Sequence, residues 1–325
     1  MIPRYIKNRD RLKALLPELK RHLEGCSLCP RRCQADRRVH KGLCGVGNET
    51  AVALFQPFFY EEPPVSGTRG AGNVFFTGCN LTCIFCQNYE ISQEYKGVFL
   101  SVEELADIFL HLQNEGHTHN INLVSPTPHL PFIIPALLLA AEKGLNIPVV
   151  YNTNGYETAE SVEMIALFTD IFLPDLKYIS SGPAQELSGA ADYPRFAWEA
   201  VEKMIALNGY GQISSEGIME EGIIVRHLVL PGYIEESIRL LEEIRRRLGK
   251  YVPVSVMSQY TPAWNAKEHP LMKRPLKNEE YQRIIDKVEE LGFEKGWVQG
   301  LESAGEDYIP LFFGEKVQLF GRKGV

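Results

Sequence analysis

Short apolar runs of strand length alternate with amphipathic helical patterns from Asn73 to Leu291, and this alternation restricts the fold more than any other feature of the chain. Consecutive strand–helix units of this kind form a parallel sheet with right-handed crossovers. We therefore expect an α/β fold, a partial (β/α) barrel of the TIM type, with functional side chains at the carboxyl ends of its strands. The predicted strands cover 73–77, 120–124, 148–151, 170–173, 223–230 and 252–257.

The best-defined helix in this pattern covers 101–115. Ser101 and Glu104 have the spacing of a capping box, in which each side chain accepts a hydrogen bond from the backbone N–H of the other residue. Apolar side chains then recur at helical spacing, and Gly116 ends the pattern. Further helices are predicted at 133–143, after Thr158, and at 194–207, 238–244 and 278–291.

Residues 1–70 depart from this alternation and contain a cysteine- and arginine-rich stretch that ends at Gly47. A short helix is predicted at 10–23, a strand at 51–60 and an irregular connection at 61–67. We predict three parts: an N-terminal Cys-rich extension at 1–70, the barrel at 71–300, and a C-terminal tail at 301–325 that packs on the barrel.

The composition argues against a nucleic-acid or membrane partner. The 325 residues carry a formal net charge of −7 and only short basic clusters, whereas nucleic-acid binding needs many clustered Lys and Arg side chains. The longest apolar stretch, 131–141, is much shorter than the roughly 20 residues that span a bilayer. Residues 1–20 mix charged and apolar side chains, unlike a secretory signal, so we expect a cytoplasmic location.

The seven cysteines fall into two tight groups, which in a reducing compartment indicates metal or redox sites rather than disulfides. The second group, Cys79, Cys83 and Cys86, follows the first predicted barrel strand with the spacing C-x3-C-x2-C. Three thiolates on a [4Fe–4S] cube leave one iron without a protein ligand, whereas electron-transfer clusters use four cysteines. The alternatives are unrelated buried cysteines or a structural zinc site completed by a histidine of the segment 111–119.

The loop from Thr77 to Asn88, with Phe85 directly before the third cysteine, resembles the cluster-binding loop of the radical S-adenosylmethionine (SAM) superfamily. The resemblance implies that SAM chelates the open iron through its amino and carboxylate groups and is cleaved by an electron from the cluster. The resulting 5′-deoxyadenosyl radical takes a hydrogen atom from the substrate. From 73 to 260 the chain resembles the glycyl-radical-enzyme activases, the family of the pyruvate formate-lyase activating enzyme, in a branch with an N-terminal cysteine segment.

Two strand ends carry turns that this resemblance assigns to cofactor binding. Ser125 and Thr127 stand where the family has a Gly-Gly-Glu turn that binds the amino group of SAM, although the carboxylate is missing here. Asn152, Thr153 and Asn154 resemble the Asp-Thr-Asn-Gly segment of the family, with Asn152 in place of the acidic residue. Ordinary turn formation is the alternative explanation for both segments.

Later strands carry charged and aromatic residues with similar implied roles. Asp175 and Lys177 resemble the Leu-Asp-Leu-Lys strand end of the family and would engage the opposite charges of the methionine moiety. Arg226 would pair with the SAM carboxylate, and Tyr260 stands where the family often has a histidine near the adenosyl group. The alternatives are a solvated ion pair for Asp175 and Lys177 and core packing for Tyr260.

The first cysteine group, Cys26, Cys29, Cys33 and Cys44, supplies four thiols within nineteen residues. Four thiolates suit either a structural zinc ion or a second [4Fe–4S] cluster, and the sequence does not decide between them. A second cluster would relay electrons to the first, whereas zinc would hold the extension on the barrel. A non-enzymatic alternative is a cysteine-based, metal-bound interaction module.

The predicted function is a radical SAM enzyme that activates a protein substrate, such as a glycyl radical enzyme, by hydrogen-atom abstraction. This chemistry requires no catalytic side chain beyond the cluster and cofactor, and the chain has no convincing acid–base pair or nucleophilic triad. The resemblance also implies a ferredoxin or flavodoxin as electron donor. The alternative is a radical SAM enzyme that modifies a small molecule or another protein residue. The target and the oligomeric state are not identified by the sequence.

Overall fold

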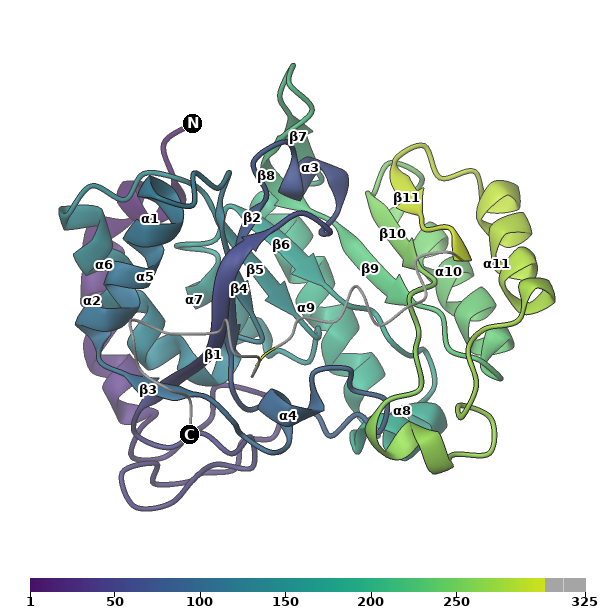
Figure 1. The fold of residues 1–325 in the computed structure, drawn as a ribbon, viewed down its shortest axis with the longest axis horizontal. Coiled ribbons are helices and arrows are strands. Elements are labelled where there is room, and N and C mark those ends of the chain that lie inside the picture. Colours follow the sequence, from purple (N-terminus) through teal and green to yellow (C-terminus); the bar gives the residue numbers. More distant parts are fainter. Residues whose placement is uncertain (302–311, 313–325) are drawn as a thin grey trace.

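The computed structural model describes residues 1–301 and Phe312, and its centre is a sheet of eight strands in the order β3-β1-β2-β4-β5-β6-β8-β7 (Figure 1). The five strands from β2 to β8 in this order are parallel, while β1, β3 and β7 pair antiparallel at the two edges. The strands are β1 (Thr50–Phe58), β2 (Ala71–Phe76), β3 (Val98–Leu100), β4 (Ile121–Val124), β5 (Val149–Thr153), β6 (Ile171–Pro174), β7 (Gly211–Ile213) and β8 (Met219–Ile223).

A second, three-stranded parallel sheet continues the barrel wall in the order β11-β10-β9. Its strands are β9 (Val225–Leu228), β10 (Val254–Met257) and β11 (Gly296–Val298). A parallel bridge between Asp175 and Arg226 joins the end of β6 to β9. The predicted partial (β/α) barrel is therefore confirmed, as a mostly parallel eight-stranded sheet and a parallel three-stranded sheet joined edge to edge.

The helices flank the strands in Figure 1, as expected for crossover connections. Helix α5 begins with the predicted capping box: the Glu104 N–H donates to the Ser101 hydroxyl over 3.1 Å, and the Ser101 N–H donates to the Glu104 carboxylate over 2.9 Å. The helices are α1 (Arg4–Lys7), α2 (Arg9–Arg21), α3 (Pro63–Ser66), α4 (Tyr89–Ser92), α5 (Val102–Asn114), α6 (Leu130–Glu142), α7 (Ala159–Ile165), α8 (Ser181–Ser188), α9 (Tyr193–Asn208), α10 (Ile234–Leu248) and α11 (Asn278–Leu291), with 3-10 turns η1 (Thr127–His129) and η2 (Trp264–Glu268).

The N-terminal segment packs closely on the rest of the chain. Helix α2 lies against α6, the buried Tyr5 of α1 donates its hydroxyl to the Ile147 carbonyl over 3.1 Å, and β1 pairs with β2 in the main sheet. Leu12 and Leu19 are the buried face of α2. The boundary at residue 70 remains a prediction. The predicted tail at 301–325 lies outside the described residues except for Leu301 and Phe312.

The strand predicted at 223–230 is wrong in one respect, because this stretch is divided between two sheets. Gly222, the residue before the end of β8, has a φ of +126° and lies directly against Gly211, where an added Cβ would come within 2.2 Å of the Gly211 Cα. The chain then leaves β6 at Ile224 and begins β9, which pairs with β10. The connection predicted at 61–67 also differs, since it contains the short helix α3.

Among the described residues, no helix combines the length and apolarity that crossing a membrane requires.

Candidate functional site

The three cysteines of the 79–86 loop lie at the carboxyl end of β2, and each thiol has at least one polar partner. The Asn154 amide donates to the Cys79 Sγ over 3.3 Å. The Cys83 Sγ lies 2.9 Å from the Ser188 hydroxyl of α8, and the Cys86 Sγ lies 3.2 Å from the Ser92 hydroxyl of α4. N–H and O–H groups directed at sulfur are the outer contacts that orient thiolate ligands.

Backbone hydrogen bonds hold this loop at both ends. The Gly78 N–H donates to the Ile91 carbonyl over 2.8 Å, and the Ile84 N–H donates to the Leu187 carbonyl over 2.9 Å. The Cys79 N–H donates to the Cys44 carbonyl over 3.2 Å. The loop is therefore fixed between α4, α8 and the N-terminal cysteine segment.

The loop suits a metal cluster, because Cys83 is buried, Cys79 and Cys86 are half-buried, and the three thiols are close enough to affect one another's ionisation. Burial and the neighbouring Cys83 raise the pKa of Cys79 to about 12 and that of Cys86 to about 11. Burial also raises the pKa of Cys83, while the charge of Lys177 opposes this effect. Such thiols stay protonated alone and ionise when a metal binds. In the part of the chain that the structure describes, no group of His, Cys, Asp or Glu is arranged to hold a single metal ion, whereas a [4Fe–4S] cube takes one thiolate at each iron.

A buried ion-pair network crosses the barrel interior next to this loop. The Arg226 guanidinium donates to Asp175 over 3.0 Å and to the Asn152 side-chain carbonyl over 2.6 Å, and it lies 3.5 Å from Glu61. Asp175 also accepts from Lys177 over 2.6 Å. Burial raises the pKa of Asp175, but Lys177 and Arg226 outweigh it and hold that pKa below its usual value.

The network brings together four of the predicted cofactor residues, Asn152, Asp175, Lys177 and Arg226. The charged side chains among them form ion pairs with one another. Arg226, Asp175 and Lys177 are each at least 86% buried, since their side chains are 13%, 14% and 14% exposed. Glu61, which the sequence did not single out, is fixed by amides of two strands: the Asn73 and Asn122 side chains donate to it over 2.9 and 3.0 Å. Binding of SAM by these residues remains a prediction.

A second buried carboxylate, Glu157, organises the two predicted threonines. The hydroxyls of Thr127 and Thr153 both donate to its Oε1 atom over 2.6 Å, and the Tyr151 hydroxyl lies 3.4 Å from the same atom. The Oε2 atom of Glu157 has no hydrogen-bond partner among the described residues. In this structure the Thr127 and Thr153 hydroxyls therefore donate their hydrogen bonds to the Glu157 carboxylate.

Relative to the wild type, the Glu157→Gln variant is expected to gain more unfolding free energy at pH 8 than at pH 5. Burial raises the pKa of Glu157 from 4.5 to about 7. The stability that this group contributes is therefore complete below pH 4.5 and is lost as the pH rises through about 7. The loss is about 3 kcal/mol, and glutamine, which does not ionise, avoids it. Thermal unfolding of the wild type and the variant at both pH values measures the difference, and a difference that does not change with pH would contradict the assignment.

Ser125 and Tyr260 occupy the remaining predicted positions. Ser125 has a φ of +57°, and its N–H donates to the Asn152 carbonyl over 3.0 Å, so it forms the turn after β4. Tyr260 is buried, with its hydroxyl donating to the Met272 carbonyl over 2.5 Å and its ring 6.4 Å from that of Phe85. Tyr260 therefore packs against the cysteine loop, and these contacts occupy its hydroxyl.

The N-terminal cysteines gather beside the same loop. All four line one pocket, which also includes Asn80 of the 79–86 loop. Arg31 connects the two segments, because its guanidinium donates to the Asn80 carbonyl over 2.9 Å and to the Gly189 carbonyl over 2.7 Å. Figure 1 shows this N-terminal loop at the same end of the barrel as α4. The two cysteine groups are thus neighbours in space.

Replacing Gly78 with alanine is expected to push the 79–86 loop away from the N-terminal cysteine segment. Gly78 has a φ of +80°, and an added Cβ would lie 2.4 Å from the Cys44 carbonyl oxygen. We expect a loss of about 3 kcal/mol in unfolding free energy, from backbone strain and this clash together. Gly144→Ala is the matched control, because Gly144 has a φ of +103° with no atom within 4 Å and should lose only about 1 kcal/mol. Equal melting temperatures for the two variants would contradict the predicted contact.

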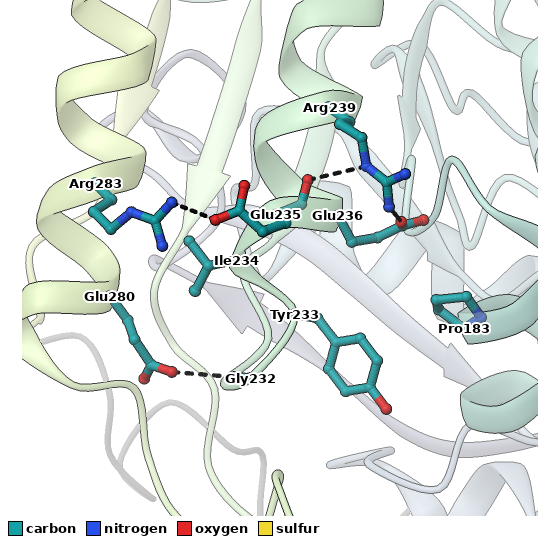
Figure 2. Close-up of a pocket in the computed structure, with 9 residues that line it drawn as sticks. All are labelled: Pro183, Gly232, Tyr233, Ile234, Glu235, Glu236, Arg239, Glu280 and Arg283. Carbon is teal, nitrogen blue, oxygen red and sulfur yellow. Dashed lines mark hydrogen bonds and ion pairs between the residues drawn. The ribbon is translucent and has the colours of Figure 1, made fainter.

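Two further pockets lie away from the cysteines. One lies inside the barrel next to the ion-pair network and is lined by Glu61, Glu62, Arg226, Ser255, Met257 and Trp297, among others. The other is a surface pocket between α8, α10 and α11, and Figure 2 shows its charged side chains paired with one another, Arg283 with Glu235 and Arg239 with Glu236. Because these four side chains pair with one another, none of them offers an unpaired charge for a reaction.

The sequence analysis missed Glu61, Glu157 and Ser188. The one signal for Glu61 is the presence of two amides, Asn73 and Asn122, within otherwise apolar strands, because buried amides need polar partners. Glu157 and Ser188 carry no comparable signal, since each lies in a connection or helix whose neighbours do not reveal what it faces.

Comparison with known proteins gives a consistent result. Residues 73–248, more than half of the chain, match the family model described as the Radical SAM superfamily. An uncharacterized protein of Methanocaldococcus jannaschii is 30% identical over 83% of this chain and 76% of its own length. The pyruvate formate-lyase-activating enzyme of Clostridium pasteurianum is 26% identical over 60% of this chain and 77% of that enzyme. The crystal structure of Streptococcus suis SuiB bound to precursor peptide SuiA aligns with a TM-score of 0.45 and 15% identity, over 68% of this chain and 46% of the SuiB chain, so this chain spans less than half of SuiB.

Proposed function

The chain belongs to the radical SAM superfamily, and from that premise we propose that it activates a protein substrate by abstracting a hydrogen atom, as a glycyl-radical-enzyme activase does. The superfamily uses a [4Fe–4S] cluster and SAM, and when bound together they supply a 5′-deoxyadenosyl radical. The cluster ligands in this proposal are Cys79, Cys83 and Cys86. We also propose that the four N-terminal cysteines hold a second metal centre, either zinc or iron–sulfur.

The observation that carries the proposal is the cysteine loop at the carboxyl end of β2, with one buried and two half-buried thiols and an adjacent, charged barrel interior. The likeness to the Clostridium pasteurianum pyruvate formate-lyase-activating enzyme supports the activase role, because it covers most of that enzyme. Hydrogen abstraction by a radical also requires no side-chain acid or base, which agrees with a barrel interior in which Asp175 pairs with both Arg226 and Lys177.

The residues of the chain bind and orient in this scheme. Asn154 and the hydroxyls of Ser188 and Ser92 fix the three thiols. Lys177 lies near Cys83 and contributes positive charge beside the negatively charged thiolates. The buried network of Arg226 and Asp175 supplies a preorganised polar wall beside the interior pocket.

The proposal is tested with the anaerobically reconstituted, dithionite-reduced chain. Incubation with SAM should release 5′-deoxyadenosine, and incubation with a co-expressed glycyl radical enzyme should produce a protein-based glycyl radical detectable by electron paramagnetic resonance (EPR). Release of 5′-deoxyadenosine without a glycyl radical on any co-expressed protein would contradict the activase role and favour a small molecule or another protein residue as the target.

A further inference from the structure

The four N-terminal cysteines, Cys26, Cys29, Cys33 and Cys44, line a single pocket. A structural zinc ion and a [4Fe–4S] cube both take four thiolates, so the surroundings of the pocket have to distinguish the two.

A buried cation beside these cysteines lacks a partner. Arg37 is only 2% exposed, and its Nε donates to the Gly47 carbonyl over 3.0 Å. Its Nη1 and Nη2 atoms have no hydrogen-bond partner among the described residues, and the nearest ring, that of Phe132, is 6.0 Å from the guanidinium carbon. Its charge acts on Cys44, which places the guanidinium near the cysteine pocket. A buried, unpaired guanidinium costs several kcal/mol, so the position calls for an anion.

The anion that fits is a metal centre with four thiolates. A [4Fe–4S] cube with four cysteines carries a net negative charge, which a neighbouring cation compensates. Arg31 is less suited to this role, because it is only half-buried and its Nε and Nη1 groups bond the Asn80 and Gly189 carbonyls. Among the described residues around this pocket, Arg37 is the buried cation whose Nη1 and Nη2 donors lack hydrogen-bond partners.

The two cysteine groups are in direct contact. The Cys79 N–H donates to the Cys44 carbonyl over 3.2 Å. Asn80 lines the N-terminal pocket, and its side-chain carbonyl accepts from Asn154 over 2.7 Å, while the same Asn154 amide reaches the Cys79 Sγ over 3.3 Å. A single residue therefore separates the N-terminal pocket from the ligands of the SAM-binding cluster. This proximity suits electron transfer between two iron–sulfur clusters, whereas a zinc ion is redox-inactive and carries no electrons.

We propose that Cys26, Cys29, Cys33 and Cys44 bind a second [4Fe–4S] cluster that passes electrons to the cluster at Cys79, Cys83 and Cys86, and that Arg37 compensates its negative charge. The relay function rests on the proposed radical SAM chemistry, whereas the identity of the second centre does not. A low-potential ferredoxin or flavodoxin gives one electron to the N-terminal cluster and is itself oxidised by one electron. The N-terminal cluster then returns to its oxidised state as the SAM-binding cluster gains that electron.

The identity of the centre is tested first, by iron, sulfide and zinc analysis of the full chain prepared anaerobically. The variant with Cys79, Cys83 and Cys86 replaced by alanine should retain about four irons and four sulfides of the roughly eight in the wild type. Its reduced cluster should give an EPR signal that SAM does not change. A zinc ion in place of the remaining iron, or no metal at all, would overturn the proposal without bearing on the SAM-binding cluster.

Arg37 is tested by replacement with methionine, which keeps its length but removes its charge. The midpoint potential of the N-terminal cluster should become more negative, because a cation favours the reduced, more negative form, and the other cluster should change less. Arg38→Met is the matched control, since Arg38 is exposed and pairs with Glu24 and Asp36. Equal potentials in wild type, Arg37→Met and Arg38→Met would refute the role of Arg37.

The relay is tested by kinetics of reduction. In a variant with the four N-terminal cysteines replaced by serine, reduced flavodoxin should reduce the SAM-binding cluster at least about tenfold more slowly than in the wild type, while dithionite reduces it fully. An unchanged rate with flavodoxin would contradict the relay. If this variant does not fold, the iron analysis and the Arg37→Met potentials still decide the cluster and its counter-charge.

Discussion

Replacing Cys83 with alanine is expected to abolish SAM cleavage and to remove about four irons per chain. Cys83 is 9% exposed and lies between the Ser188 hydroxyl and the charge of Lys177, so no other thiol or solvent ligand takes its place. Two thiolates do not retain a cube that needs three. The measurements are release of 5′-deoxyadenosine and iron analysis of the anaerobically prepared variant.

Ser188→Ala provides a graded comparison, because it removes the hydroxyl partner of the Cys83 thiol and leaves the thiol itself in place. Loss of such an outer contact should lower activity by about 10- to 100-fold while the iron content stays the same. The change also removes the 2.7 Å hydrogen bond between the Ser188 and Tyr178 hydroxyls. SAM cleavage by the Cys83→Ala protein at the rate of the Ser188→Ala protein would show that Cys83 is not a ligand.

Replacing Arg226 with methionine is expected to lower the free energy of unfolding by about 3–5 kcal/mol. The side chain is 13% exposed and holds Asp175 at 3.0 Å and Glu61 at 3.5 Å. Without it, Asp175 keeps Lys177, but Glu61 keeps only the Asn73 and Asn122 amides. A buried carboxylate without a counter-charge is the source of the predicted loss.

The control for Arg226 is Arg246→Met. Arg246 is 67% exposed and pairs with Glu243 on the surface of α10, so its removal should cost less than about 1 kcal/mol. Urea unfolding of the three proteins measures the two differences. Similar losses for both variants would mean that the interior network does not stabilise the fold. If Arg226 also binds the SAM carboxylate, its variant should show weaker SAM binding as well, which the unfolding experiment does not report.

The sequence predicted the barrel well because its elements are long enough to show periodicity. The capping box of Ser101 and Glu104 and the buried strands at β2, β4, β5 and β6 follow from local patterns. The elements that it missed, such as α4 and β3, have only four and three residues, and runs this short show no period. The division of the 223–230 stretch between two sheets depends on the contact of Gly222 with Gly211, which lies on another strand.

The candidate site was predictable where ligand spacing is local and unpredictable where partners are distant. The spacing of Cys79, Cys83 and Cys86 placed them in one loop, as the structure has them. The contact between Arg226 and Glu61 could not be predicted in this way, because the two residues lie far apart in the sequence and only the closure of the barrel brings them together. The threonines at 127 and 153 bond Glu157, a partner that the sequence did not indicate, and their role in binding SAM stays a prediction.

The most direct test of the account is low-temperature EPR of the anaerobically prepared, reduced wild-type protein before and after addition of SAM. The account requires a [4Fe–4S] signal that changes when SAM binds, because one iron of the cube at the 79–86 loop has no protein ligand and is free to bind the cofactor. A spectrum without such a cluster, or a cluster signal that SAM leaves unaltered, would contradict it.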